Sequence, residues 1–224
     1  MRIEYRGERP SIHPEAWVAP TAVLSGDVRV GAGSRVLFGA VLTAEGGPVE
    51  IGERCVVMEH AVIRGSRRHP VRIGDHVLIG PRASLSGCTV ADRVFLATGA
   101  TVFNGAMIER GSEVRVNGVV HLKTRVPAGS TVPIGWVAVG DPAEILPPFE
   151  HDRIWAVQQA LDFPQEVFGL ERGDDPAALI EAITDRYCRA LGAHRDDRIV
   201  DEDPAPAPDG RRTMPETSPG GGGT

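Results

Sequence analysis

An aliphatic side chain recurs at every sixth residue through most of the chain. A period of six fits neither an α-helix, with about 3.6 residues per turn, nor a two-faced strand, with a period of about 2. It fits a short strand followed by a turn, and three such units close one triangular coil. The pattern therefore predicts an all-β solenoid with these side chains inside. The aliphatic positions are Val18, Leu24, Val30, Val36, Leu42, Ile51, Val57, Ile63, Ile73, Ile79, Leu85, Val90, Leu96, Val102, Ile108, Val114, Val120, Val126 and Val132.

The number of aliphatic positions predicts about six coils, since each coil uses three of them. A small or β-branched residue follows each of the first four positions by four residues, at Ala22, Val28, Ser34 and Ala40, where it fits a tight corner. One unit cannot bury its own apolar side, so the coils must stack. The alternative, a β-sandwich, would show turn signals every 8–12 residues or so and no period of six.

The repeat and its loss divide the chain into four regions. We predict an N-terminal cap over residues 1–16, the solenoid over 17–146, a helical extension over 147–198 and a disordered tail over 199–224. Two segments interrupt the solenoid, a short loop over 43–48 and a basic loop over 64–71. The tail is rich in Asp, Pro, Gly and Ser, a composition typical of disorder.

Two helices are expected in the extension, packed against the solenoid or a neighbouring subunit. The first covers 151–162, where Ile154, Val157 and Leu161 have helical spacing and Pro164 ends or interrupts the run. The second has Asp174 or Asp175 as a cap, Pro176 in its first turn and Gly192 as a stop. Its apolar stripe consists of Leu179, Ile180, Ile183, Tyr187 and Leu191.

Composition restricts the classes of function. The formal net charge of −6 at pH 7 argues against nucleic acid as a partner. No run approaches the roughly 20 apolar residues of a membrane span, and the charged start does not resemble a signal peptide. The three cysteines, Cys55, Cys88 and Cys188, lack a CxxC pair and indicate reduced thiols. We expect a cytoplasmic protein without a membrane partner.

Residues 17–146 resemble the γ-class carbonic anhydrase family. The resemblance is carried by IGERCVVMEHAVIR, IGDHVLIGPRASLSGC and VFLATGATVFNGAMIERGSEV, and by the ending VGDPAEIL. It implies a left-handed parallel β-helix that assembles as a homotrimer. The broader relatives of this family are hexapeptide-repeat acyltransferases.

In that family three histidines at a subunit interface hold zinc or iron, which makes hydroxide from bound water near neutral pH. The matching positions here are Arg64, Pro81 and Ser86. The proline side chain has no donor atom, and arginine stays protonated. We therefore expect neither metal, and no carbonic anhydrase activity of the metal-hydroxide kind.

The resemblance also indicates what could replace the metal. The family's Arg-Gly-Asp becomes Thr43-Ala44-Glu45 and its Gln-Asp becomes Met58-Glu59, while Asn104 keeps a residue type seen in many relatives. We predict a cleft between subunits that binds a small anion. Alternatively, Arg64 pairs with Glu45 or Glu59 and only holds subunits together. The candidate ligand-binding residues are Arg64, Ser86, Glu45, Glu59, Arg82 and Asn104, with Arg67, Arg68 and His69 near them.

Two further functions stay open, and with them the question of whether the protein is an enzyme. The first is a transferase that uses an acyl-CoA donor, with His60, His121 or the loop residue His69 as general base. The second is a carbonic anhydrase or hydrolase with a metal relocated between subunits. The catalytic candidates are His60, His121 and Glu59, and the histidines of the solenoid are predicted to face outward.

Overall fold

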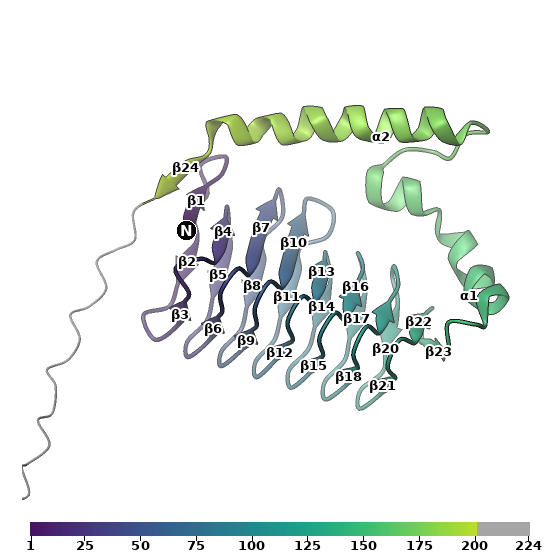
Figure 1. Ribbon diagram of the computed structural model, residues 1–224, viewed down its shortest axis with the longest axis horizontal. Coiled ribbons are helices and arrows are strands. Elements are labelled where there is room, and N and C mark those ends of the chain that lie inside the picture. Colours follow the sequence, from purple (N-terminus) through teal and green to yellow (C-terminus); the bar gives the residue numbers. More distant parts are fainter. Residues whose placement is uncertain (201–224) are drawn as a thin grey trace, which may run out of the picture.

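The computed structural model describes residues 1–200 and confirms the predicted solenoid. Short strands wind into three parallel sheets that form the walls of a triangular prism (Figure 1). The chain passes from sheet 1 to sheet 2 to sheet 3 and back to sheet 1, so each coil adds one strand to every sheet. The corners between sheets 1 and 2, 2 and 3, and 3 and 1 carry the turns.

The strands are two to five residues long. Sheet 1 contains, in spatial order, β24 (Arg198–Val200), β1 (Arg2–Glu4), β4 (Val23–Ser25), β7 (Val41–Glu45), β10 (Val62–Ser66), β13 (Ser84–Ser86), β16 (Thr101–Val102), β19 (Val119–Val120), β22 (Val137–Val139) and β23 (Glu144–Leu146). Sheet 2 contains β2 (Ser11–Ile12), β5 (Val28–Val30), β8 (Val49–Ile51), β11 (Val71–Ile73), β14 (Thr89–Val90), β17 (Met107–Ile108) and β20 (Arg125–Val126). Sheet 3 contains β3 (Trp17–Val18), β6 (Arg35–Val36), β9 (Val56–Val57), β12 (Leu78–Ile79), β15 (Phe95–Leu96), β18 (Glu113–Val114) and β21 (Thr131–Val132).

The period of six arises from aliphatic ladders inside the prism. In sheet 1, Leu24 lies opposite Leu42, Leu42 opposite Ile63, and Ile63 opposite Leu85, and all four are fully buried. Each such side chain contributes about 1.5–3 kcal/mol by leaving water. A coil therefore becomes stable only when its neighbours cover it.

The prism has more coils than the sequence pattern predicted. Two sheets have seven strands, which makes seven complete coils, and β22 begins an eighth. The estimate of about six missed strands at both ends. Residues 2–12 supply β1 and β2, which pair in parallel with β4 and β5, and Ala138 continues the period with a side chain too small to be counted.

Close packing at the corner between sheets 2 and 3 requires glycine. A Cβ atom on Gly31 would lie 2.6 Å from the carbonyl oxygen of Gly52, and one on Gly52 would lie 2.6 Å from that of Gly74. Glycines one coil apart therefore let successive backbones approach each other.

The residues after the prism, 151–200, form what we call the C-terminal arm. It contains α1 (His151–Gln158), the 3₁₀ turn η1 (Gln159–Leu161), the π-helical turn η2 (Pro164–Phe168), α2 (Pro176–Leu191) and the 3₁₀ turn η3 (Gly192–Asp196). Helix α2 runs back along the prism toward the N-terminal coil (Figure 1). There β24 pairs antiparallel with β1, so the arm is attached at both ends.

Both predicted helices are present. The carboxylate of Asp175 caps α2 by accepting a hydrogen bond of 2.9 Å from the Ala177 amide. In α1 only Ile154 is buried, and Asp162 takes a left-handed conformation before Pro164. The apolar stripe of α2 is only partly covered: its Leu179, Ile183 and Tyr187 are half-buried, whereas Ile180 and Leu191 are exposed.

The start of the predicted disordered tail, 199–224, is instead part of a strand. Ile199 and Val200 belong to β24, because β1 at the end of sheet 1 offers them free backbone partners. The prediction of disorder for the rest of the tail concerns residues 201–224, which lie outside the described residues.

Candidate ligand-binding site

Arg64 and Ser86 lie side by side on the outer face of sheet 1. Strands β10 and β13 are parallel, with Arg64 directly opposite Ser86. Both side chains point outward because their neighbours Ile63 and Leu85 point inward. The Nε atom of Arg64 lies 3.5 Å from Oε1 of Glu45, at the end of β7. The structure thus brings three of the candidate ligand-binding residues together.

Pro81, Arg82 and Glu59 lie at the opposite end of the sheet 1 strands. They occupy successive turns at the corner between sheets 3 and 1, where the Arg82 amide donates a 2.9 Å hydrogen bond to the Glu59 carbonyl. Within one subunit they lie away from Arg64 and Ser86. A site that contains all of these residues therefore needs a second subunit.

His60 lies at the same corner and faces outward, as predicted. Its backbone is left-handed, with φ of 57°. Its ring packs against Gly39 of the preceding coil. A Cβ atom added to Gly39 would lie 2.5 Å from Nδ1 of His60. This histidine packs against the corner and lies far from the other catalytic candidate, His121, which is at the corner between sheets 1 and 2.

A second polar cluster lies at the corner between sheets 1 and 2, beneath the C-terminal arm. Glu166 of η2 places Oε1 3.1 Å from Nε2 of His69 and Oε2 2.6 Å from Nζ of Lys123. Asn104 and His69 both lie beside Gly87. A Cβ atom added to Gly87 would be 2.3 Å from Cβ of His69 and 3.2 Å from Nδ2 of Asn104. His69 and Asn104 are therefore separated from Arg82 and Glu59 by the width of sheet 1.

Glu166 joins the arm to the prism by charge. Partial burial alone raises the pKa of Glu166, but the hydrogen bond and charge of Lys123, together with His69, outweigh it and hold the pKa below its usual value. The carboxylate is thus ionised at neutral pH and has one cationic partner on the prism.

Glu166→Gln should lower the free energy of unfolding at pH 7 by up to about 1 kcal/mol, because it removes a half-exposed ion pair. A lowered pKa in the folded state makes this contribution present above the unfolded value of about 4.3 and lost as the pH falls through the folded value. Urea unfolding followed by circular dichroism should show the difference at pH 7 and little of it near pH 3. The control is Glu171→Gln, at an exposed position of the same arm. An equal difference at both pH values would contradict the charge-based attachment.

His121 faces a cavity under the first part of the arm. Its side chain follows the inward Val120 and points out of the prism, as predicted, but the arm half-buries it. Burial lowers the pKa of His121, so its imidazole is mainly neutral at pH 7. Its ring lies 5.7 Å from that of Phe103, and within residues 1–200 its buried Nδ1 has no hydrogen-bond partner. The cavity, of about 530 Å³, is lined by His121, Trp155, Gln158, Gln159, Phe163 and Arg172 among others.

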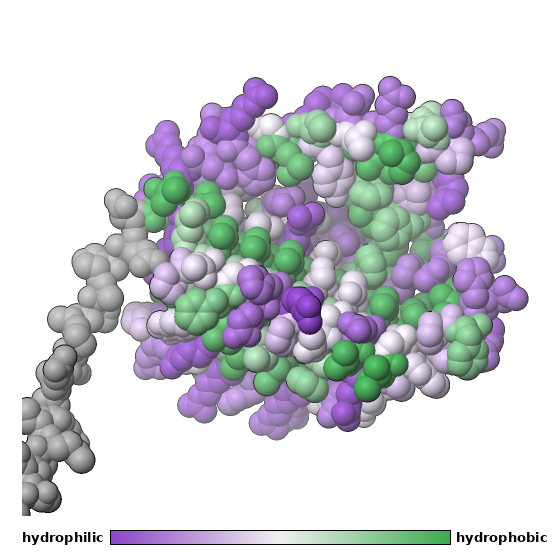
Figure 2. All heavy atoms as spheres, viewed as in Figure 1, coloured by the Kyte–Doolittle hydropathy of each residue, from purple (hydrophilic) through white to green (hydrophobic). Residues whose placement is uncertain are grey.

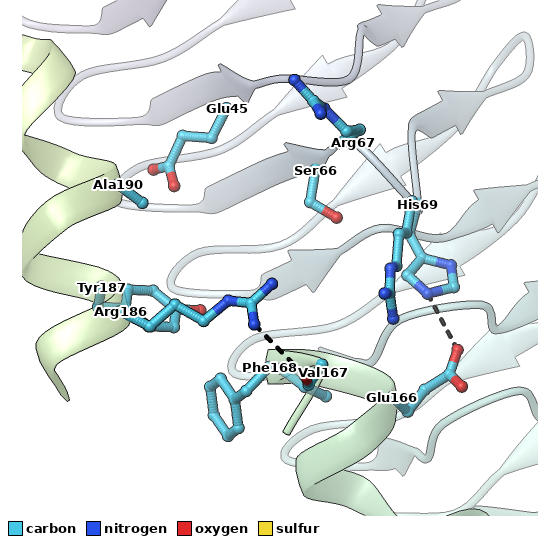
Figure 3. Close-up of a pocket in the computed structure, with 12 residues that line it drawn as sticks. Glu45, Ser66, Arg67, His69, Glu166, Val167, Phe168, Arg186, Tyr187 and Ala190 are labelled. Atoms are coloured by element: carbon cyan, nitrogen blue, oxygen red, sulfur yellow. Dashed lines mark hydrogen bonds and ion pairs between the residues drawn. The ribbon is translucent and has the colours of Figure 1, made fainter. Parts of the chain in front are cut away.

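Another cavity, of about 250 Å³, lies between α2 and the basic loop (Figure 3). This loop covers 67–70 in the structure and is shorter than predicted, because 64–66 extend β10 along β7 and Val71 begins β11. Figure 3 shows Glu45 and Arg67 on the prism side and Arg186 and Tyr187 on the helix side. The loop residues were identified from the sequence. Glu166, Arg186 and Tyr187 were not, because only the return path of the arm brings them to the loop.

Among residues 1–200, no three His, Cys, Asp or Glu side chains are grouped so that they could hold a metal ion. In the same part of the chain, no helix has the length and apolar character needed to cross a membrane.

Comparison with known proteins places this fold in a family. No protein-family model matches the chain. Gamma carbonic anhydrase 1, mitochondrial, of Arabidopsis thaliana is 33% identical over 157 residues, which cover 67% of this chain and 55% of the relative. The carnitine operon protein CaiE of Salmonella agona is 30% identical over 142 residues, covering 63% of this chain and 69% of that protein. The chain spans about half the length of the first two relatives it matches, both mitochondrial plant proteins.

Solved structures include a CoA complex. PerB of Caulobacter crescentus, in complex with CoA and GDP-perosamine, is 30% identical over 61% of this chain and 56% of that chain, with a TM-score of 0.39. A putative acetyltransferase of Bacillus cereus is 21% identical over 84% of this chain and 94% of that chain, with a TM-score of 0.40. Both scores are below 0.5, so the family assignment depends on the sequence relatives.

The sequence period, the three parallel sheets and these relatives define a hexapeptide-repeat protein with a left-handed parallel β-helix. Within that superfamily the chain belongs to the γ-carbonic-anhydrase-like family. The predicted resemblance is thereby confirmed. The cytoplasmic location stays a prediction, because some relatives are mitochondrial.

Proposed function

We propose that this protein is a homotrimer whose clefts between subunits bind a small anion and carry out no metal-hydroxide chemistry. The observation that supports this most directly is the register of β10 against β13, which puts the Arg64 guanidinium next to Ser86. Those are two of the three positions at which the family has metal-binding histidines. Pro81, at the third, reaches the cleft from a neighbouring subunit.

The side chains at these positions do not fit a metal ion. A guanidinium has no lone pair to offer and carries a positive charge that repels a cation. Proline offers no side-chain donor, and the Ser86 hydroxyl alone is a weak ligand.

Arg64 fits an anion instead. Its side chain is 47% exposed, and its one carboxylate partner, Glu45, is 3.5 Å away, a loose pair. A guanidinium in this setting can turn its planar fork toward a carboxylate or bicarbonate. The Ser86 hydroxyl, one strand away, can donate a further hydrogen bond to the same ligand.

The distribution of exposed apolar side chains supports the trimer. Most large exposed apolar residues of the prism strands and corners lie on sheets 1 and 3 and at the corner between them, while Met107 lies on sheet 2. Those on sheets 1 and 3 and at their corner are Trp17, Phe38, Val62, Leu78, Val116 and Ile134. Sheet 2 carries charges on its outer face, at Arg29, Glu50, Arg72 and Arg125. An apolar edge beside a charged face favours self-association through sheets 1 and 3.

Arg64→Gln tests the anion cleft, with oxalate as the probe in isothermal titration calorimetry. Loss of a charge-assisted hydrogen bond worth about 1.5–3 kcal/mol should weaken oxalate binding about tenfold or more. The control Arg29→Gln removes an exposed arginine from sheet 2 and should leave affinity unchanged. If Arg64→Gln dissociates the assembly and does not alter oxalate affinity, Arg64 only joins subunits and the cleft is a scaffold.

A transferase acting on an acyl-CoA is the second candidate function, favoured by His121. A half-buried, neutral imidazole beside an open cavity of about 530 Å³ suits a general base. An uncharacterized transferase of Bacillus subtilis is 29% identical over 40% of this chain and 53% of that protein. If acetyl-CoA raises the melting temperature of the native protein and of His121→Ala alike, and only the native protein releases CoA from it in the presence of an acceptor, this second candidate replaces the first.

A further inference from the structure

Two adjoining cavities form one groove beneath α2, within a single chain. The first, of about 250 Å³, lies between the loop after β10 and the middle of the helix, and the second, of about 360 Å³, lies toward the N-terminal coil. They share Glu45, Arg67, Arg186 and Ala190 as lining residues. In Figure 2 the surface is hollowed between α2 and the prism. The groove is therefore a feature of the arm and prism together and needs no second subunit.

Guanidinium groups from three segments line this groove. Arg67 and Arg68 come from the loop after β10, Arg186 from α2, and Arg6 from the turn after β1. Two of them converge on Gly169, since a Cβ atom there would lie 3.3 Å from Nη2 of Arg186 and 3.5 Å from Nη2 of Arg68. Within residues 1–200 the Arg186 side chain has one hydrogen-bond partner: its Nη1 donates to the Gly169 carbonyl oxygen at 3.3 Å.

The two carboxylates in the groove are already paired. Glu166 is held by Lys123 and His69, and Glu45 lies beside Arg64. Within residues 1–200, the arginines Arg6, Arg67, Arg68 and Arg186 form no ion pair. Like charges held close together in a partly enclosed groove repel one another, and a bound anion would relieve that repulsion.

We propose that this groove binds the diphosphate group of a small organic ligand. Arginine forks match the oxygens of phosphate in pairs, and convergence from three segments suits a group with several oxygens better than one carboxylate. The shared Arg67 and Arg186 can bridge two linked phosphates, one in each cavity. Phe168 and Tyr187, whose rings lie 5.7 Å apart, provide an apolar wall for the organic part of the ligand.

This site does not depend on the anion cleft between subunits. It uses none of Arg64, Pro81 and Ser86, and it is complete in one chain, although Glu45 lies at the border of both sites. Oxalate binding that depends on Arg64 and diphosphate binding that depends on Arg186 can therefore succeed or fail separately.

The test is calorimetric titration of the full chain with inorganic pyrophosphate at constant ionic strength. The double variant Arg68→Gln, Arg186→Gln should weaken binding at least a hundredfold. The matched control is Arg189→Gln, an exposed arginine one turn further along α2 that does not line the groove. The proposal is overturned if pyrophosphate gives no binding at millimolar concentration, if sulfate binds equally well, or if the double variant keeps its affinity.

A second measurement on the unmodified sequence avoids any folding defect of the double variant. Phenylglyoxal modifies accessible arginines, and mass spectrometry reports the extent of modification at each one. Pyrophosphate should protect Arg68 and Arg186 and leave Arg189 unprotected. Equal modification of all three with and without pyrophosphate would contradict the site.

Discussion

Replacing Arg64, Pro81 and Ser86 together by histidine should turn a protein that binds no zinc tightly into one that holds about one zinc ion per subunit. The expectation follows from the register that places Arg64 beside Ser86, and from the proposed trimer, which brings the third position in from a neighbour. Three imidazoles leave a fourth position open for water, which is the arrangement of catalytic zinc sites. The gain should be from no measurable zinc to a stoichiometric amount after dialysis, measured by elemental analysis.

The control for this variant is the pair Arg64→His and Ser86→His with Pro81 kept. Two ligands from one subunit should hold zinc far more weakly, so dialysis should remove it. If the pair retains zinc as well as the triple variant does, Pro81 does not face the cleft. If the triple variant is a trimer and gains no zinc, the three positions do not converge, and the proposed cleft is wrong.

Phe38→Asp combined with Ile134→Asp should dissociate the proposed trimer into monomers. Both side chains are large, exposed and apolar, at 49% and 69% of full exposure, and both lie at the corner between sheets 3 and 1. Burying an aspartate without a partner in an apolar contact costs several kcal/mol, and two sites per subunit multiply the effect. Light scattering coupled to gel filtration should show a fall from three subunits to one, each of 23.9 kDa.

Met107→Asp is the matched control for the interface. Met107 is similarly exposed, at 43%, but lies on the charged outer face of sheet 2. This variant should remain trimeric. A native protein that already runs as a monomer would refute the assembly, and dissociation by Met107→Asp would place the contact on another face.

The prism could be read from the sequence because its order is local. Each coil repeats the same inward aliphatic residue, so Leu24, Leu42, Ile63 and Leu85 indicate both the period and the ladder they form. The cap of α2 was equally local, since Asp175 and Pro176 act on the first turn that follows them. The number of coils was underestimated where a small side chain, Ala138, replaced the aliphatic signal.

The functional region was predicted only in part. Arg64, Glu45 and Ser86 were named as a group, and the structure brings them together because strand register follows from the repeat. His60 and His121 were named as alternative bases, and they lie at different corners of the prism, His121 beneath the arm and His60 at the corner between sheets 3 and 1. Asn104 was assigned to the same site as Arg82. Within one subunit the two lie at different corners, so that assignment stays a prediction that depends on a second subunit.

The sequence by itself determined the solenoid, the approximate places where loops interrupt it and the identity of the residues at the family's metal positions. The loop bounds 43–48 and 64–71 were too wide, because 43–45 belong to β7, 64–66 to β10 and Val71 to β11. Periodicity, turn residues and side-chain donors are properties of residues close together in the chain, so no distant contact is needed to recognise them. Only the tertiary structure decided that α2 folds back along the prism, that Glu166 reaches His69 and Lys123, and that Arg186 meets Arg68 at Gly169. These contacts join residues roughly 40 to 120 positions apart, and they depend on the path of the arm, which no repeat encodes.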